Sequence, residues 1–226
     1  MHFFMKEAEK MNLEVLYEDN HVIVAYKPAG ILSQADNTGD LDMLSLVKDY
    51  IKRKYNKEGN VFLGLVHRLD RMTSGVMVFA RTSKAAMRLS EDIKKHQFYK
   101  EYLAVCEGEV KEYFPTELIN YLSKDEKNNK SYLDPMGKEA VLTYQNIKFK
   151  NNKSLVRIKL KTGRHHQIRV QMANLGHPLY GDIKYGSKYQ ENLALQAYKL
   201  SFYQPVSREL LTFEKINYEV IFNIFK

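Results

Sequence analysis

The chain has 226 residues, and its 35 Lys and Arg against 27 Asp and Glu give a formal net charge of +8. This length supports one substantial core, and the basic excess favours a polyanionic partner, because each phosphate neutralised by Lys or Arg releases a condensed counterion. One cysteine, Cys106, excludes an intramolecular disulfide framework and a cysteine-based zinc site, and we expect it to be a buried, inert thiol.

The start of the chain indicates neither secretion nor membrane insertion. In residues 1–12, which we interpret as an N-terminal extension, acids and lysines interrupt the few apolar residues, so no signal-peptide pattern forms. No run of about 18 apolar residues occurs anywhere. We therefore expect a cytoplasmic protein without a membrane span.

The first third of the chain predicts short strands around one helix. Residues 13–30 fit two strands that meet at a turn and end at a Pro and a Gly. Residues 41–55 place apolar side chains at helical spacing, so an amphipathic helix is expected there. Two apolar strands, 61–66 and 75–80, flank the segment "HRLD".

The rest of the chain alternates in the same way. Ser83 is expected to cap a helix that runs to Lys95, and residues 121–131 are polar enough to predict an exposed loop. A second helix is predicted at residues 165–176, with Gly176 as its end. Further strands are expected at 100–108, 139–149, 154–160 and 193–205. The pattern predicts a single α+β domain, residues 13–226, with a mostly antiparallel sheet and flanking helices.

Polar residues interrupt this apolar pattern in three places. The first is "HRLD", where Asp70 stands between two arginines, either as an ion pair on a turn or as a reactive carboxylate at a sheet edge. The second is the "KEY" that begins at Lys100. The third is "KTGRHHQIRV", residues 161–170, in which Arg169 is expected to face away from the apolar stripe of its helix, free to point into a cleft.

Several common kinds of site lack the residues that they need. His165 and His166 would diverge by roughly 100° on a helix, and no Cys or acid lies at ligand spacing beside them, so we expect no metal. A glycosidase needs a second carboxylate opposite Asp70, and none has a plausible setting. Ser74 has no nucleophile elbow that would support a catalytic triad.

Five blocks carry a resemblance that covers nearly the whole chain, from about Leu13 to about Phe213. The blocks are "HRLDRMTSG", "KEYLAV", "GKEAVLTY", "TGRHHQIRVQMANLGHPLYGDIKYG" and "LALQA". In order and spacing they resemble the RluA-type pseudouridine synthases. The resemblance implies a bent, mixed β-sheet with a central RNA-binding cleft, and isomerisation of uridine to pseudouridine in RNA without cofactor or metal.

The resemblance also implies roles for individual residues. Asp70 matches the catalytic aspartate, Tyr102 matches the tyrosine that stacks on the target base and takes the C5 proton, and Arg169 matches the arginine that pairs with the aspartate. The matching blocks further imply RNA contacts at Arg68, Arg71, Lys138, Arg164 and His166. Asp70 could attack the ribose C1′, attack the base at C6 or remove a sugar proton, and the residues leave these routes open.

The substrate and the alternatives are less defined by the sequence. Large-subunit ribosomal RNA is the first expectation and transfer RNA the second, and a monomer is expected. The S4 RNA-binding module that many such enzymes carry is not matched, and glutamine stands at positions 171 and 196, where the family commonly has histidine. A non-catalytic RNA-binding or ribosome-assembly factor and a nucleoside hydrolase remain as rivals, which product analysis would separate.

Overall fold

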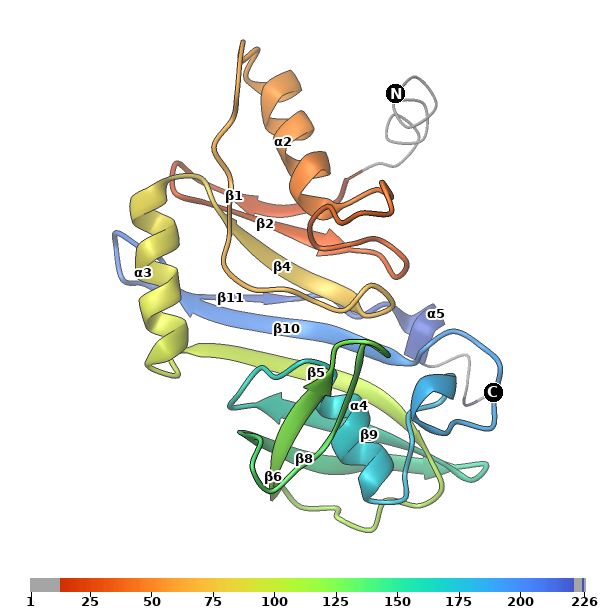
Figure 1. The fold of residues 1–226 in the computed structure, drawn as a ribbon. Helices are drawn as coiled ribbons and strands as arrows, with labels where there is room; N and C mark the ends of the chain where they lie inside the picture. The colour runs from red at the N-terminus through yellow and green to blue at the C-terminus, as the bar shows by residue number, and fades with distance from the viewer. Residues whose placement is uncertain (1–12, 222–224, 226) are drawn as a thin grey trace. The chain divides into compact units, whose positions relative to one another are not determined.

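A computed structural model describes residues 13–221 and Phe225 (Figure 1). The N-terminal extension predicted for residues 1–12 lies outside the described residues. Contacts between residues divide the chain into two compact units. The first unit comprises Met1–Phe98 with Lys199–Lys215, and the second comprises Tyr99–Tyr198 with Ile216–Lys226. The single catalytic domain expected from the sequence stays a prediction.

The first unit is a small sheet covered by helices. Its strands follow the order β1-β2-β4-β10, with β3 paired to β4 and β11 paired to β10. The pairs β1–β2, β2–β4, β3–β4 and β10–β11 are antiparallel. The elements are β1 (Val15–Glu18), β2 (Val22–Lys27), α2 (Met43–Lys54), β3 (Gly64–Leu65), β4 (Ser74–Ala80), α3 (Ser83–Lys94), β11 (Leu210–Glu214) and the Lys199–Tyr203 part of β10 (Leu195–Tyr203).

The core of the first unit explains why its central strands contain so few polar residues. Every residue of β2 and β4 is buried, as expected for strands covered on both faces. Helix α3 contributes Ala85 and Leu89 to the same core. This helix is capped by Thr82, whose side chain accepts a hydrogen bond from the Ala85 N–H, so the prediction of Ser83 as the cap was wrong by one residue.

The second unit is an antiparallel sheet with the strand order β5-β9-β8-β6-β7. The strands predicted at residues 139–149 and 154–160 are confirmed as β8 and β9, which form a hairpin with Asn151 and Asn152 at positive φ in its turn. The elements are β5 (Phe98–Glu107), β6 (Thr116–Asp125), β7 (Lys130–Leu133), β8 (Lys138–Lys150), β9 (Lys153–Leu160), α4 (Gln167–Asn174), the 3-10 helix η1 (Ile183–Tyr185) and α5 (Tyr218–Ile221). As expected, Cys106 on β5 is buried.

The segment predicted as an exposed loop, residues 121–131, is instead the hairpin β6–β7. Ladder pairs join Leu122 to Leu133 and Asp125 to Lys130. The polar composition misled the prediction because much of this hairpin is exposed and only a few side chains face the core. Leu122 is one of them, and it packs with Val170 of α4. A strand with one solvated face needs few apolar residues.

Helix α4 also differs from the prediction. Residues 167–172 are all buried, so polar and apolar side chains alike are covered over these six residues of the helix. The Arg169 side chain is only 11% exposed, so it does not lie on an open face of the helix, and its orientation into a cleft stays a prediction. Gly176 has φ +85° just after the helix, which confirms it as the end. Figure 1 shows α4 lying on the sheet of the second unit.

The elements together confirm an α+β fold, and the strand pairs described above are antiparallel. The central RNA-binding cleft stays a prediction. Within the described residues, no helix has both the length and the apolar character that crossing a bilayer requires.

Candidate active site

Asp70 lies on the loop between β3 and β4 of the first unit, half-buried. Its carbonyl oxygen accepts a hydrogen bond from the Thr73 N–H at 3.0 Å, which closes the turn. Three residues before Asp70 the chain leaves the sheet, because the Nε2 of His67, in place of a backbone carbonyl, accepts the Val78 N–H at 3.1 Å. The histidine of "HRLD" therefore ends the β3–β4 ladder and directs the next residues away from it.

Ser33 holds the residue before Asp70. Its hydroxyl donates to the Leu69 carbonyl at 2.7 Å and accepts from the Leu69 N–H at 3.0 Å. Both residues are buried, so these bonds satisfy backbone groups that water does not reach. The backbone on this side of the acid is thus fixed by one side chain.

Lys27 and Gly30 hold the residue after Asp70. The Lys27 ammonium donates to the carbonyls of Arg71 at 2.9 Å and Pro28 at 3.0 Å. Gly30 donates its N–H to the same Arg71 carbonyl at 2.9 Å, and its own carbonyl accepts from the Arg71 Nε at 3.0 Å. Gly30 has φ +88°, a conformation that side chains disfavour. The segment "KPAG" therefore forms a clamp on the loop that bears Asp70.

The Lys27 side chain is fully buried at the end of β2. Burial lowers the pKa of its ammonium to about 7, while the attraction of Asp70 opposes that shift and the repulsion of Arg71 adds to it. The same attraction stabilises a negative charge on Asp70. Sequence analysis missed this lysine, although a single charged residue that ends the apolar run "VIVAY" was a usable signal.

The two arginines beside Asp70 are exposed, as an RNA contact requires. Arg71 also forms an ion pair with Asp40 at 2.7 Å, in which both side chains are at least 40% exposed. Its guanidinium is thus partly used in holding the loop. Arg68 lies on the same loop without a hydrogen bond or ion pair among the described residues.

Tyr102 lies in the middle of β5 of the second unit, opposite Ile158, and is buried. Two residues earlier, desolvation lowers the pKa of Lys100. A Cβ added at Gly163 would lie 3.2 Å from the Lys100 Nζ, so the glycine of "TGR" leaves room for this ammonium.

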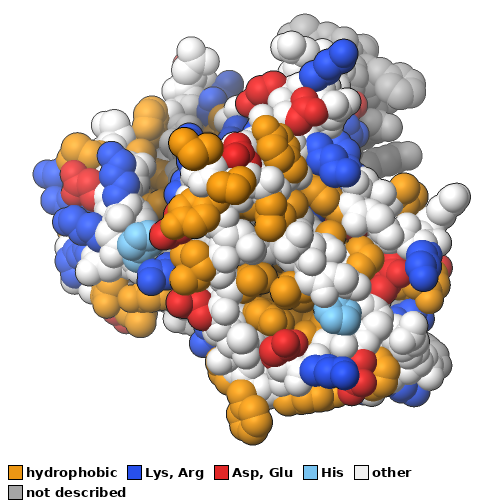
Figure 2. All heavy atoms as spheres, turned by 60° about the horizontal axis from the view of Figure 1, so that its bottom comes forward, with side chains coloured by type: hydrophobic (Ala, Val, Ile, Leu, Met, Phe, Trp, Pro, Cys, Tyr) orange, Lys and Arg blue, Asp and Glu red, His pale blue; other side chains and the backbone are white. Residues whose placement is uncertain are grey.

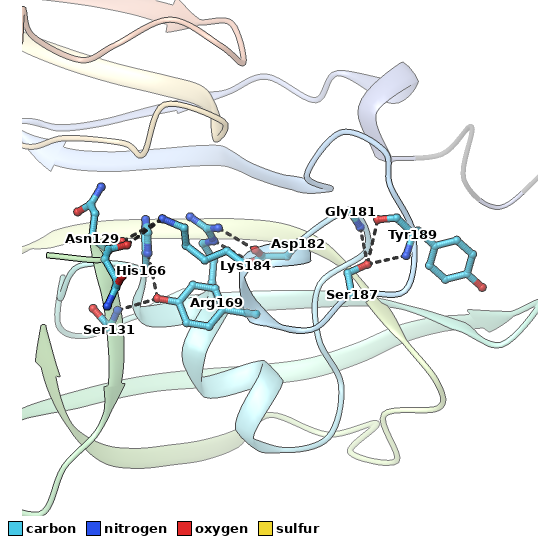
Figure 3. A network of polar contacts seen from close by, with 11 residues as sticks. Asn129, Ser131, His166, Arg169, Gly181, Asp182, Lys184, Ser187 and Tyr189 are labelled. Carbon is cyan, nitrogen blue, oxygen red and sulfur yellow. Dashed lines mark hydrogen bonds and ion pairs between the residues drawn. The ribbon is translucent and has the colours of Figure 1, made fainter. Parts of the chain in front are cut away.

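Arg169 is held by an acid that sequence analysis did not select. Its Nε and NH2 groups donate to the two carboxylate oxygens of Asp182, both at 2.7 Å (Figure 3). The Asp182 side chain is 1% exposed, so this is a buried bidentate pair. The guanidinium carbon also lies 5.1 Å from the centre of the Tyr185 ring. A usable signal for both residues was "GDIKYG" in the longest block of the resemblance.

The two adjacent histidines do not diverge, as they would on a helix. Their rings stack with centroids 3.8 Å apart and 28° between the planes. The prediction failed because both residues precede α4 and His166 has φ +51°, outside the helical range. Desolvation, supported by nearby cations, lowers the pKa of His165 to about 4 and that of His166 to about 2. Both rings are therefore neutral at physiological pH.

Ser131 determines which nitrogen of the His165 ring carries the proton. The Ser131 hydroxyl donates to the His165 carbonyl at 2.7 Å, so toward the His165 Nδ1, at 3.0 Å, it can only accept. The Tyr185 hydroxyl accepts the Ser131 N–H at 2.8 Å and lies 2.9 Å from the His166 Nδ1. His165 is thus protonated on Nδ1.

The remaining predicted RNA-contact residues occupy different environments in the second unit. Lys138 and Arg164 are exposed, and the Arg164 Nε donates to the Glu139 carbonyl at 2.7 Å. His166 is only 8% exposed. Among the described residues no group of three or more His, Cys, Asp or Glu could hold a metal ion. That Asp70, Tyr102 and Arg169 act in one site stays a prediction, because they belong to different units.

Comparisons with known sequences agree with the resemblance. The sequence model of the RNA pseudouridylate synthase family matches residues 21–174. The RNA pseudouridine synthase YhcT of Bacillus subtilis (strain 168) is 36% identical over 209 residues, covering 89% of this chain and 68% of that protein. The tRNA pseudouridine synthase C of Haemophilus ducreyi is 33% identical over 242 residues, covering 95% and 96%. The ribosomal large subunit pseudouridine synthase D of Zymomonas mobilis is 31% identical over 224 residues, covering 92% and 70%.

A comparison of structures gives the same fold. The structure of human RNA pseudouridylate synthase domain containing 4 matches with a TM-score of 0.77 at 21% sequence identity, covering 96% of this chain and 93% of that one. Human RNA pseudouridylate synthase domain containing 1 matches with a TM-score of 0.72 at 20% identity, covering 92% and 84%.

Proposed function

Because the chain belongs to the RNA pseudouridylate synthase family, we propose that it isomerises uridine in structured RNA with Asp70 as the catalytic carboxylate. The observation that carries this proposal is the clamp around the Asp70 loop, where Ser33 holds Leu69, and Lys27 and Gly30 hold Arg71. A loop fixed on both sides of an acid can present it in one geometry, as catalysis requires.

The reaction breaks the bond between uracil N1 and ribose C1′ and forms a bond between C5 and C1′, while the C5 proton is lost and N1 gains a proton. These atoms are inaccessible in a stacked helix, so the nucleotide is flipped out, at a cost of roughly a few kcal/mol. We propose that Tyr102 stacks on the flipped base and takes the C5 proton, and that Arg169 supports the charge of Asp70. The ammonium of Lys27 adds a positive charge from within the first unit.

Large-subunit ribosomal RNA is the proposed substrate, since several relatives are named for that activity. Transfer RNA is the second candidate, because the relative named for tRNA matches over nearly the full length of both chains. RNA affinity is proposed to rest on the net charge of +8. In Figure 2 the Lys and Arg side chains are distributed over the face with acids among them. Action as a monomer in the cytoplasm is part of the proposal.

The test is release of tritium from C5-labelled uridine, using total RNA from cells that lack this protein. Wild type and Asp70→Asn are assayed in parallel, and RNA affinity is measured for both. Because the variant removes the carboxylate charge and keeps the shape of the side chain, we expect turnover to fall by at least about a thousandfold. Affinity should change little.

The outcomes distinguish the rival functions. Release by wild type alone, with pseudouridine as the product, supports the proposal, and mapping the modified position identifies the RNA. Free uracil in place of an isomer would identify a hydrolase. Retained activity in Asp70→Asn would overturn the catalytic assignment. A wild type that binds RNA without releasing tritium from a substrate known to be unmodified would indicate a binding factor.

A further inference from the structure

His165 is the member of the stacked histidine pair that has one ring nitrogen uncommitted. Its Nδ1–H is used on the hydroxyl of Ser131, which is itself 2% exposed. No hydrogen bond reaches its Nε2 in the described part of the chain. The ring is half-buried, and its Nε2 is not one of the buried side-chain atoms that lack a partner, so this nitrogen presents a lone pair at the surface. An imidazole fixed in this way accepts hydrogen bonds and does not donate them.

Two lysines flank this acceptor. Lys124 is the ladder partner of Ser131, so its side chain leaves β6 on the same face as the hydroxyl that holds His165. Lys184 on η1 donates to the carbonyls of Asn128 at 3.3 Å and Asn129 at 3.2 Å in the β6–β7 turn (Figure 3). Both lysines repel a proton on His165, which shows that their charges act at the ring.

We propose that His165, Lys124 and Lys184 form a nucleotide subsite, in which the Nε2 of His165 accepts a hydrogen bond from RNA and the two ammonium groups bind adjacent phosphates. The subsite rests on the proposed function, since it takes RNA as the ligand. RNA offers two donors for this role, the ribose 2′-hydroxyl and the N–H groups of the bases. The two lysines bind the phosphates of the RNA strand, and the histidine selects for a nucleotide that offers a hydrogen-bond donor at this position.

Contacts of Tyr185 join the parts of the subsite. Tyr185 joins the hairpin to the histidine pair through its bonds to Ser131 and His166. Lys130 lies over the Tyr185 ring, 5.2 Å from its centre, which adds a third cation to this surface. Glu126 is the acid that acts on His165; it pairs with Lys124 and its side chain is 79% exposed, so a phosphate can displace it.

The first experiment measures how tightly the full-length protein binds three 12-nucleotide oligomers: oligouridylate, oligodeoxyuridylate and N3-methylated oligouridylate. Wild type and His165→Ala are compared, with the exposed His96→Ala as the matched control. We expect His165→Ala to weaken oligouridylate binding about fivefold. The control should not change it. His165→Gln should restore part of the loss, because its amide oxygen can accept.

The oligomers identify the donor. If the 2′-hydroxyl is the donor, wild type prefers the ribose over the deoxyribose oligomer and His165→Ala loses that preference. If the base N–H is the donor, the variant loses the discrimination against the N3-methylated oligomer instead. If His165→Ala binds all three oligomers as wild type does, the subsite is wrong. Tritium release by wild type, measured on the same preparations, reports separately on the proposed function.

The role of His165 as an acceptor has its own test. The groups that act on its ring are Lys124, Glu126, Arg169, His166 and Lys184. Because burial and these cations lower its pKa to about 4, the difference in affinity between wild type and His165→Ala should stay constant from pH 8 to pH 6. A difference that grows as the pH falls would mean that a protonated His165 binds phosphate, and would overturn the acceptor role.

The lysines are tested by the salt dependence of binding, which does not depend on the folding of His165→Ala. The double variant Lys124→Gln with Lys184→Gln removes two phosphate contacts. The plot of log affinity against log salt should then become less steep by about 1.4, at roughly 0.7 per phosphate of a single strand. Lys150→Gln, at the exposed end of β8, is the control and should alter it little. An equal slope in the double variant and the control would contradict the subsite.

Discussion

In the first unit the hydrogen bonds that hold the Asp70 loop end on backbone atoms of its neighbours, whereas in the second unit those that hold Arg169 end on its own guanidinium. The clamp orients Asp70 through the backbone of its neighbours, and none of the clamp's hydrogen bonds ends on the Asp70 carboxylate. The buried bidentate pair with Asp182 instead fixes the charged group itself. Under the roles proposed above, the reacting group is oriented through its backbone and the supporting charge through its own side chain.

Both units contain a bidentate Arg–Asp pair, which allows this difference to be measured. In the second unit both side chains are buried, at 11% exposure for Arg169 and 1% for Asp182. In the first unit Asp92 is buried but its partner Arg208 is 47% exposed. Water can replace the lost partner of an exposed arginine, but it cannot easily replace that of a buried one.

The largest effect is therefore expected for Asp182→Asn. Removing the acid leaves the buried charge of Arg169 uncompensated, and this should lower the free energy of unfolding by about 3 to 5 kcal/mol. Asp92→Asn, the matched control, should cost about 1 kcal/mol, because Arg208 can turn to solvent. Urea denaturation of both variants at pH 7 measures the difference.

Activity adds a second readout to this comparison. Tritium release should fall in Asp182→Asn at temperatures where the variant is still folded, because Arg169 loses its fixed position. In the Asp92→Asn control, turnover should stay near that of wild type. Equal losses of stability in the two variants would show that burial of the arginine does not decide the strength of the pair.

The next effect concerns the pH dependence of stability and Lys27. The pKa of its ammonium falls from 10.5 to about 7 on folding. Between these values the unfolded chain binds more protons, so this lysine makes stability rise with pH by at most about 1.4 kcal/mol per pH unit. Below about pH 7 both states are protonated and its contribution no longer changes.

Lys27→Met should remove that rise. The variant loses the bonds to the Pro28 and Arg71 carbonyls, so it should be less stable than wild type at pH 9.5, by about 2 kcal/mol. The deficit should shrink as the pH is lowered to 7. Thermal unfolding at intervals of half a pH unit follows it. A deficit that stays constant between pH 9.5 and pH 7 would show that folding does not lower the pKa of Lys27.

The sequence predicted the positions of many elements and the residues of the resemblance, because apolar periodicity and contiguous motifs are local properties. It did not predict the partners of those residues. Ser33 lies 36 positions before Leu69, and nothing local indicates that its hydroxyl holds that backbone. The stacked histidines were missed for a related reason, since one residue with positive φ reverses where a ring points. The loop prediction for residues 121–131 failed because pairing between the two strands, which the polar composition does not reveal, makes this segment the hairpin β6–β7.

An effect of comparable size is expected for Ser33→Ala, which removes one side chain of the backbone clamp. It leaves the buried N–H and carbonyl of Leu69 without this partner, so stability should fall by about 2 kcal/mol. Ser90→Ala is the control, because its hydroxyl only bonds the Ala86 carbonyl within α3. Turnover should fall more than RNA affinity does. A larger loss of affinity than of turnover would mean that the clamp shapes an RNA-binding surface.

The smallest effect should come from Asp40→Asn, at the exposed end of the same clamp. The ion pair with Arg71 is open to solvent on both sides, so stability should change by less than about 0.5 kcal/mol. The loop stays in place because Lys27 and Gly30 still hold the Arg71 backbone. With its acidic partner gone, Arg71 is available to a phosphate, and RNA affinity at low salt should rise by about twofold. Weaker binding by this variant would contradict the assignment of Arg71 as an RNA contact, and would leave it as a residue that positions the loop of Asp70.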